Sequence, residues 1–152
     1  SMIKIFIVLL LCLLGALFFT LYKNDANLFQ APGFIQRVSI FLTSNTAVTK
    51  DDHEFEELRT PVYKMSAEAL YNRVVLVGSR LGWEVLASDS DNQNVNFVAL
   101  SPVFLFKDDV FVQIKFIDIN KSSLYIQSSS RKGKADMAAN SAHIQALIRG
   151  IK

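Results

Sequence analysis

The residues best suited to binding a ligand form one polar and cationic cluster, which consists of Ser128, Ser130, Arg131, Lys132 and Lys134. Hydroxyl groups, a guanidinium group and the N-terminus of a following helix are the groups with which proteins bind anions. A phosphate in a lipid headgroup, or a carboxylate on a partner protein, has the matching chemistry. The cluster is therefore a candidate anion-binding or partner-binding site.

A structural role for the same stretch is the alternative. Arg131 would then pair with Asp108 or Asp109 in a solvated loop, while Asp136 and Asn140 would cap the last helix. A carboxylate at the start of that helix would also repel an anion, which weakens the binding hypothesis. We favour the structural role and keep these residues, with the cluster, as candidate ligand-binding or partner-binding residues.

Asp108 and Asp109 are adjacent carboxylates at the start of a predicted strand. Successive side chains of a strand point to opposite faces, so the two carboxylates cannot converge on one reacting centre. This geometry argues against a glycosidase-like pair of acids, which needs both carboxylates in one cleft. Either one Asp contacts an ion or ligand, or one accepts backbone N–H bonds while the other pairs with Arg131. The second interpretation is favoured.

No pattern for metal binding or catalysis is present. His53 and His143 have no other His or Cys at ligand spacing, so a zinc site is not expected. We expect His143 to lie exposed or at the edge of the last helix. No nucleophile elbow, phosphate-binding glycine loop or zinc-protease helix occurs. The sequence predicts no cofactor and leans towards a domain that is not an enzyme.

Residues 3–22 form a long apolar stretch, and Ile5 to Tyr22 carry no charge. Eighteen residues of helix rise about 27 Å, close to the hydrocarbon thickness of a bilayer. A core helix of a soluble protein would carry a polar face, and this stretch has none. The sequence predicts a single transmembrane anchor.

A cleaved signal peptide is the alternative to a retained anchor. Its apolar region is usually about 7–15 residues long and ends in small residues, whereas this one ends in bulky Phe18, Phe19 and Tyr22. Lipidation at Cys12 is disfavoured because Leu11 precedes it where a small residue is needed. We therefore expect the segment to be retained.

Charges around the anchor indicate its orientation. Lys4 precedes the apolar stretch, while Lys23 and Asp25 after it offset each other. The positive-inside rule then predicts a cytoplasmic N-terminus and a C-terminal domain on the periplasmic or lumenal side. The lack of any cysteine after Cys12 is compatible with export.

The composition beyond the anchor limits the possible partners. Lys4 is the only one of the 16 Lys and Arg residues that precedes Tyr22, so 15 remain against 14 Asp and Glu. A nucleic-acid-binding domain would show a basic excess, so no nucleic-acid partner is expected. The remaining length suits a single domain.

Two regions follow the anchor. Residues 23–42 are predicted to be a linker or juxtamembrane segment, because residues 23–34 contain turn formers without periodicity. Phe29, Phe34 and Phe41 make this segment too apolar for a free tether, so we expect it to contact the domain or the membrane interface. Residues 43–152 are predicted to be the folded domain.

Apolar residues of the domain recur every second position in some segments, as in strands, and at helical spacing in others. Ser66 is a good N-cap for a helix that Gly82 would end, and a second helix is predicted to begin at Asp136. Strands are predicted at residues 55–63, 83–86, 95–100, 110–117 and 124–128. The expected fold is an α+β domain with an antiparallel four- or five-stranded sheet and two helices on one face, preceded by the transmembrane helix.

The late part of the chain resembles the domain-of-unknown-function 1499 family of bacterial and plant proteins. Residues 106–110 match its Phe-x-Asp-Asp-Val stretch, and residues 128–140 match its Ser-x-Ser-Arg-x-Gly-x-x-Asp-x-Gly-x-Asn motif. Looser elements resemble residues 45–48 and 53–58. The resemblance covers residues 43–151, and the spacing of the two late motifs makes it specific.

The chain departs from the family pattern at four positions. Gln127 replaces a common Arg, Ala138 a usual Gly, Glu57 a usual Pro, and His143 a position that is often basic. The resemblance implies the fold and a membrane-proximal or exported setting, and it implies no activity. We expect a non-enzymatic, membrane-anchored accessory domain that binds a protein partner. The alternatives are a lipid-headgroup or small-anion binder and, more distantly, a hydrolase.

Overall fold

The computed structural model describes residues 1–152, which form four α-helices, one 3-10 helix and six strands. In chain order these are α1 (Met2–Lys23), α2 (Phe34–Thr43), β1 (Thr46–Val48), η1 (Glu56–Leu58), β2 (Val62–Tyr63), α3 (Ala67–Arg80), β3 (Glu84–Asp89), β4 (Asn94–Leu100), β5 (Lys107–Asp118), β6 (Lys121–Ser130) and α4 (Ala139–Ile151).

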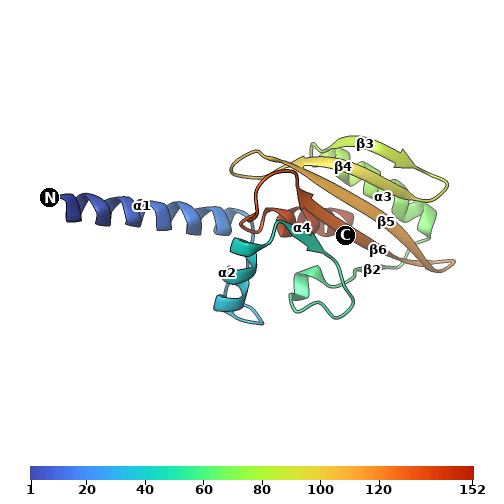
Figure 1. The fold of residues 1–152 in the computed structure, drawn as a ribbon. Helices are drawn as coiled ribbons and strands as arrows, with labels where there is room; N and C mark the ends of the chain where they lie inside the picture. The colour runs from blue at the N-terminus through green and yellow to red at the C-terminus, as the bar shows by residue number, and fades with distance from the viewer.

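The six strands form one antiparallel sheet in the order β1-β6-β5-β4-β3, with β2 also paired to β6. Helices α3 and α4 contact each other and cover one face of this sheet (Figure 1). The other face carries no helix. The predicted two-layer α+β fold is confirmed, with one more short strand than expected.

The core lies between the sheet and the two helices. Alternate residues of the central strands point towards the helices, as the side-chain period of two requires. The buried apolar side chains of the sheet and helices include Val95, Phe97, Val110, Val112, Leu124, Ile126, Leu70, Val74, Val77, Ile144, Leu147 and Ile151. Packing of this core fixes the positions of the N-terminal ends of β5 and α4.

Helix α3 begins and ends at the residues that the sequence indicated. The Ser66 hydroxyl accepts a hydrogen bond from the Ala69 N–H at 3.1 Å, which satisfies one free donor of the first turn. Gly82 has a φ of 78°, a conformation that glycine adopts without steric cost. The helix can therefore stop there and lead directly into β3.

The strand predicted at residues 55–63 is wrong over most of its length. Residues Glu56–Leu58 form the 3-10 helix η1, and only Val62–Tyr63 pair as a strand. Phe55 and Leu58 are both buried, and the Leu58 N–H donates to the Phe55 carbonyl. Their spacing of three puts both side chains on one side of a helical turn, whereas a strand would point them to opposite sides.

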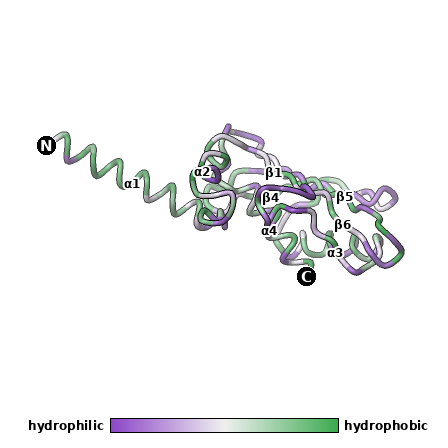
Figure 2. The backbone as a smooth tube through the Cα atoms, turned by 90° about the horizontal axis from the view of Figure 1, so that it is seen from below, coloured by the Kyte–Doolittle hydropathy of each residue, from purple (hydrophilic) through white to green (hydrophobic).

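Helix α1 projects from the domain and is long and apolar enough to cross a membrane, a test that a signal sequence near the N-terminus also meets. Figure 2 shows its largely hydrophobic course, with α2 beside its inner end. Only Thr20 and Leu21 near that end are buried. The helix is thus a candidate anchor or signal sequence that touches the domain at its last turn.

The segment predicted as a linker is folded against the domain. Its second half is helix α2, where the sequence analysis placed no regular structure. Its first half is held by hydrogen bonds to the C-terminal region: Asn24 Nδ2 donates to the Met137 carbonyl at 2.8 Å, and Gln145 Nε2 donates to the Asp25 carbonyl at 3.0 Å. Residues 23–42 therefore do not lift the domain away from the end of α1.

Arg37 on α2 joins this segment to the domain. Its buried guanidinium group donates to the carbonyls of Ala26 and Ala31 and to the Glu57 carboxylate at 2.6 Å. It also lies over the Phe55 ring, 4.2 Å from the centroid. Burial acts to raise the pKa of Glu57. The hydrogen bond and charge of Arg37, together with hydrogen bonds from the Glu57 backbone and from Asn27, outweigh it, so the pKa is lowered. Glu57, which departs from the family pattern, thus supplies the partner of a buried cation.

Candidate functional site

The two adjacent carboxylates diverge, as the strand geometry predicted. Asp108 points towards the helices and is buried, while Asp109 points to the uncovered face of the sheet. The ion pair expected for Arg131 is formed by Asp109, with Nη2 to Oδ1 at 2.8 Å. Both side chains are well exposed, at 39% and 49%, so solvent screens this pair.

His143 is buried, and its predicted exposed position is wrong. The side chain is 5% exposed, and its Nε2 lies 2.7 Å from Asp108 Oδ2. The ring also meets Trp83 edge-on at 5.8 Å between centroids. His143 directly precedes Ile144 and follows Asn140 by three residues, which places it on the inward stripe of α4. This helical spacing is the feature of the sequence from which the burial of His143 could be predicted.

Asn140 connects the motif residues at the start of α4. Its Oδ1 accepts from the Ser128 hydroxyl at 2.7 Å. Its Nδ2 lies within 2.8 Å of the Asn45 carbonyl, Ser130 Oγ and Asp136 Oδ2. Ser128 and Asn140 are fully buried, so they hold β6, β1 and α4 together and present no free group to a ligand.

Asp136 is not the N-cap of the last helix, because α4 begins at Ala139. Ala138 lies between them in the left-handed region with a φ of 71°, which explains why the related motif has Gly here. Asp136 Oδ1 instead accepts from the Ala138 N–H at 2.9 Å. Burial raises the pKa of the Asp136 carboxyl, as does nearby Asp108, while hydrogen bonds from Asn140 and Ala138 oppose the shift.

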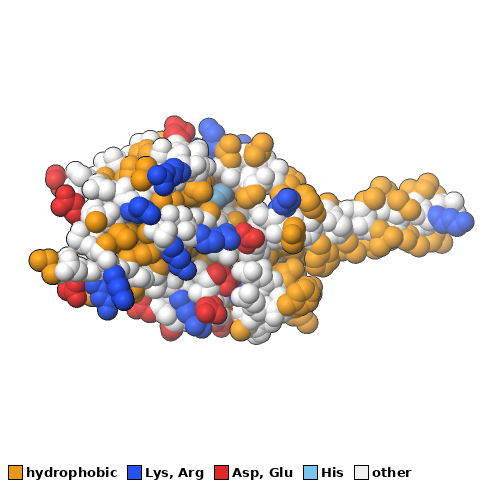
Figure 3. Space-filling view, turned by 180° about the vertical axis from the view of Figure 1, so that it is seen from behind, with side chains coloured by type: hydrophobic (Ala, Val, Ile, Leu, Met, Phe, Trp, Pro, Cys, Tyr) orange, Lys and Arg blue, Asp and Glu red, His pale blue; other side chains and the backbone are white.

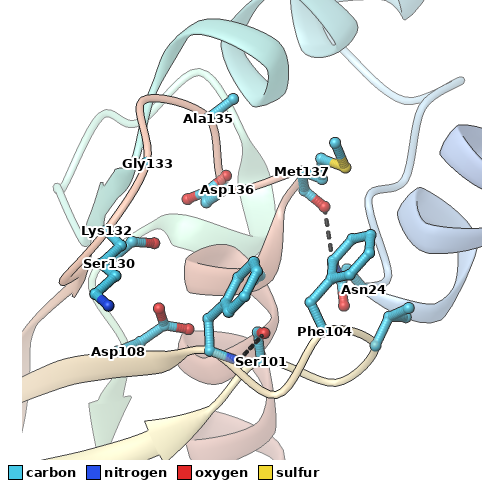
Figure 4. A pocket seen from close by; sticks show the side chains of 13 residues that line it. Asn24, Ser101, Phe104, Asp108, Ser130, Lys132, Gly133, Ala135, Asp136 and Met137 are labelled. Carbon is cyan, nitrogen blue, oxygen red and sulfur yellow. Dashed lines mark hydrogen bonds between the residues drawn. The ribbon is translucent and has the colours of Figure 1, made fainter.

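A cavity of about 380 Å³ lies between the β4–β5 loop, the β6–α4 loop and the end of α1. Figure 4 shows the carboxylates of Asp108 and Asp136 on one side of this cavity, with Phe104 and Met137 on the other. Ser130 and Lys132 also contribute to its lining. The cavity thus combines two carboxylates from different elements with an apolar wall.

Two oxygen atoms of the lining residues have no hydrogen-bond donor. Asn24 is buried and its Oδ1 is unpartnered, while its Nδ2 is engaged with Met137. Asp108 binds His143 through Oδ2, and no donor reaches its Oδ1. Because buried polar atoms are normally paired, the unpaired Asn24 Oδ1 favours a ligand that brings a donor, and Asp108 Oδ1 can accept from the same ligand.

A second hollow of about 290 Å³ adjoins the cavity and is basic. It is lined by Leu105, Phe106, Lys107, Arg131 and Lys132, of which Phe106 and Lys132 also line the cavity. Lys107 and Lys132 form no salt bridge, whereas Arg131 is paired with Asp109. The cavity with its two carboxylates and the basic hollow are therefore contiguous, because both are lined by Phe106 and Lys132.

The structure divides the predicted site residues into four groups. Asp108, Ser130 and Asp136 line the cavity, and Ser128 and Asn140 support it from within. Asp109 and Arg131 pair on the uncovered side of the sheet, where Arg131 also lines the second hollow. Lys134 is exposed and lines neither hollow.

Asn24, Ser101 and Phe104 are among the lining residues that the sequence did not indicate. Asn24 had been placed in the linker, and no local pattern relates it to Met137, which is 113 positions away.

Fold and site together define a two-layer antiparallel α+β domain that carries a largely apolar cavity with two carboxylates, beside an apolar N-terminal helix. The chain belongs to the family described as "Protein of unknown function (DUF1499)", which matches residues 33–151. The suspected relationship is confirmed, and the match also includes helix α2. No curated protein shows significant similarity to the chain.

Proposed function

We propose that the protein is a single-pass, membrane-anchored binding domain, not an enzyme, on the periplasmic or lumenal side, whose cavity receives a lipid headgroup. One observation carries this proposal: the cavity lies at the end of the domain that joins α1, and Asn24, directly after α1, lines it. A helix of 22 residues rises about 33 Å, close to the thickness of the hydrocarbon core. With α1 across the bilayer, the cavity lies at the level of the headgroups.

Exposed apolar residues surround the cavity on this side. Phe104, Leu105 and Phe106 on the β4–β5 loop are 52%, 63% and 58% exposed. Figure 3 shows hydrophobic side chains continuing from α1 onto the adjoining end of the domain. Contiguous exposed apolar groups mark an interaction surface, and Phe and Leu side chains are among those that insert at the boundary between headgroups and acyl chains. This arrangement supports contact between the domain and the bilayer.

The hydrogen bonds of the cavity support binding rather than catalysis. Ser130 Oγ accepts from Asn140, and Ser101 Oγ accepts from the Phe106 N–H. Neither hydroxyl is hydrogen-bonded to a histidine or carboxylate that would activate it as a nucleophile.

A protein partner is the second candidate, and the far end of the sheet favours it. Phe116 and Ile119 at the tip of the β5–β6 hairpin are 71% and 79% exposed. Figure 1 shows this tip at the opposite end of the domain from α1. A bilayer that holds α1 would leave the tip free to contact a partner in solution.

Retention of lipid by the purified full chain tests the proposed function. The protein is extracted in a mild detergent, and native mass spectrometry measures the phospholipid bound to it. Ala135→Phe fills the cavity that Ala135 lines, and Ala87→Phe makes the same change on exposed β3. We expect wild type and Ala87→Phe to retain lipid, and Ala135→Phe to lose most of it.

Two other results would count against headgroup binding. Equal retention by all three proteins would mean that the lipid is bound elsewhere. Absence of lipid from the wild type, with one stoichiometric protein recovered by crosslinking and lost in Phe116→Ser, would favour the protein partner.

A further inference from the structure

We infer that the site is selective for a zwitterionic headgroup with a primary amine: the ammonium group enters the acidic cavity and the phosphate lies in the adjoining basic hollow. This inference rests on the proposed function and specifies its ligand. The chemical class is a phosphate ester of ethanolamine, whether carried by a phospholipid or free in solution.

The acidic cavity supplies the charge for the ammonium group. Asp108 at the start of β5 and Asp136 on the β6–α4 loop both line it. No Lys or Arg side chain pairs with either carboxylate, and the only charged-residue partner is His143 at Asp108. Removing carboxylates from water without a compensating cation is unfavourable. A cationic ligand would supply that compensation.

The free acceptors distinguish a primary amine from a quaternary one. Asp108 Oδ1 and Asn24 Oδ1 have no donor from the protein. A primary ammonium group carries three N–H donors, which match an excess of acceptors, whereas a choline group carries none. A buried site built for hydrogen bonds discriminates strongly against an analogue that leaves its polar groups unpaired.

Aromatic rings stand beside these acceptors. Phe104 and Phe106 are stacked with their centroids 5.6 Å apart, and both line the cavity. The face of an aromatic ring attracts a cation, and its apolar body suits the glycerol end of a lipid. The rings therefore complement both the charge and the adjoining apolar part of the ligand.

The basic hollow is placed to hold the phosphate. Lys107 and Lys132 both line it and neither is neutralised by a carboxylate, so their charges are available to an anion. Lys132 and Phe106 belong to both hollows, so the two sites are contiguous. In phosphoethanolamine, two carbon atoms separate the amine from the phosphate ester. Adjacent hollows of opposite charge suit that short dipolar group.

Binding of defined lipids to the full chain tests this selectivity. The delipidated protein in detergent is titrated with short-chain phosphatidylethanolamine, phosphatidylcholine and phosphatidylglycerol of equal acyl length, and with free phosphoethanolamine. Native mass spectrometry gives the affinities. We expect phosphatidylethanolamine to bind about tenfold or more tightly than the other two lipids. The choline group has no N–H donor for the free acceptors, and the glycerol headgroup has no positive charge for the carboxylates.

Two variants test the two halves of the site. Asp136→Asn should weaken phosphatidylethanolamine binding about tenfold, and Lys132→Gln should weaken both phosphatidylethanolamine and phosphatidylglycerol. Lys132 is exposed and forms no salt bridge, so Lys132→Gln stays informative if Asp136→Asn disturbs the loop. Asp118→Asn and Lys121→Gln at the far hairpin are matched controls and should leave every affinity unchanged.

The possible outcomes separate this inference from the proposed function. Equal binding of all three lipids, or a preference for phosphatidylglycerol, would overturn the amine selectivity while leaving headgroup binding intact. Absence of binding by any lipid and by phosphoethanolamine would overturn both. Free phosphoethanolamine that binds as tightly as the lipid would support the amine chemistry and replace the lipid by a soluble ligand.

Discussion

Arg37 and Arg131 each pair with a carboxylate, but their surroundings differ. The Arg37 guanidinium is fully buried and donates to carbonyls of the segment that precedes α2 as well as to Glu57. The Arg131 pair lies in solvent. Losing one partner of a buried pair leaves an uncompensated charge, whereas exposed pairs contribute little. Burial of the ion pair therefore determines how much stability is lost when the arginine is replaced.

Replacing Arg37 by Ala should strongly destabilise the domain. The change strands the Glu57 carboxylate and several carbonyl groups, so we expect a loss of about 3–5 kcal/mol in the free energy of unfolding. Denaturant titration of the full chain in detergent measures it. Arg131→Ala is the control and should unfold at the wild-type midpoint. Similar midpoints for Arg37→Ala and wild type would show that α2 does not hold the domain together.

Asp136 should make stability depend on pH. Its pKa is raised in the folded protein by burial, so the native state binds more protons than the unfolded state between the ordinary and the raised pKa. Stability from this group is therefore present at low pH and is lost as pH rises through the raised pKa. We expect the difference in unfolding free energy between wild type and Asp136→Asn to fall across that range.

Glu57 gives a control of opposite sign for this experiment. Its pKa is lowered, so its contribution is present above the ordinary pKa and is lost as pH falls through the lowered value. The difference between wild type and Glu57→Gln should therefore shrink as the solution is acidified. A wild-type minus Asp136→Asn difference that rises with pH would contradict the raised pKa of Asp136.

Helix α3 lies close to the sheet at one glycine. A Cβ atom added at Gly78 would meet the ring of Phe97 on β4. Phe97 is fully buried and is also held edge-on by Trp83 at 5.4 Å between centroids. The ring cannot move aside without disturbing the core, so the separation of helix and strand depends on the missing side chain.

Gly78→Ala should destabilise the domain by about 1–3 kcal/mol because it overpacks this contact. Alanine favours the helix by about 1 kcal/mol relative to glycine, so a net loss would show that packing outweighs helix propensity. The midpoint of denaturation measures it. Ser79→Ala at the exposed neighbouring position is the control and should be neutral or slightly stabilising. A more stable Gly78→Ala variant would refute the tight contact.

The position of the whole domain relative to α1 follows from contacts near Asn24 and Asp25. Asn24 binds the Met137 carbonyl, the Asp25 carbonyl accepts from Gln145, and the Asp25 carboxylate pairs with Arg149 at 2.9 Å. Arg37 adds a buried contact to the same segment. With α1 in a bilayer, the domain would therefore keep one end against the membrane.

A probe on the β4–β5 loop should report that contact. After Cys12→Ser removes the only cysteine, Leu105→Cys is labelled with an environment-sensitive fluorophore and the full chain is placed in lipid nanodiscs. We expect blue-shifted emission that lipid-borne quenchers reduce. Ile119→Cys at the far hairpin is the control and should report water. Equal aqueous emission at both sites would mean that the loop does not touch the bilayer.

Retention and orientation of α1 can be tested in intact cells or organelles. We expect mass spectrometry of the native protein to detect residues before Tyr22, because no good cleavage site precedes the domain. Protease added from the periplasmic or lumenal side should digest the domain. A native chain that starts after Tyr22 would identify a cleaved signal, and a protected domain would reverse the orientation.

Local patterns along the chain determined much of this protein. The apolar course of α1, the ends of α3 at Ser66 and Gly82, and the opposite directions of Asp108 and Asp109 all follow from residue type and periodicity. These features depend on neighbours within a few positions, so the sequence alone contains the relevant physics. The antiparallel sheet with two helices on one face followed from the same periods and the short connections.

Only the tertiary structure decided the cavity and its supports. It buries His143 against Asp108, brings Glu57 to Arg37, starts α4 at Ala139, and places Asn24 beside two loops far along the chain. The contacts of His143 with Asp108, of Glu57 with Arg37 and of Asn24 with the two loops join residues that no local periodicity pairs. Their energies come from burial and from pairing of polar groups, which exist only after the core has closed. Residue types therefore indicated which groups could bind a ligand, and packing decided which of them share one cavity.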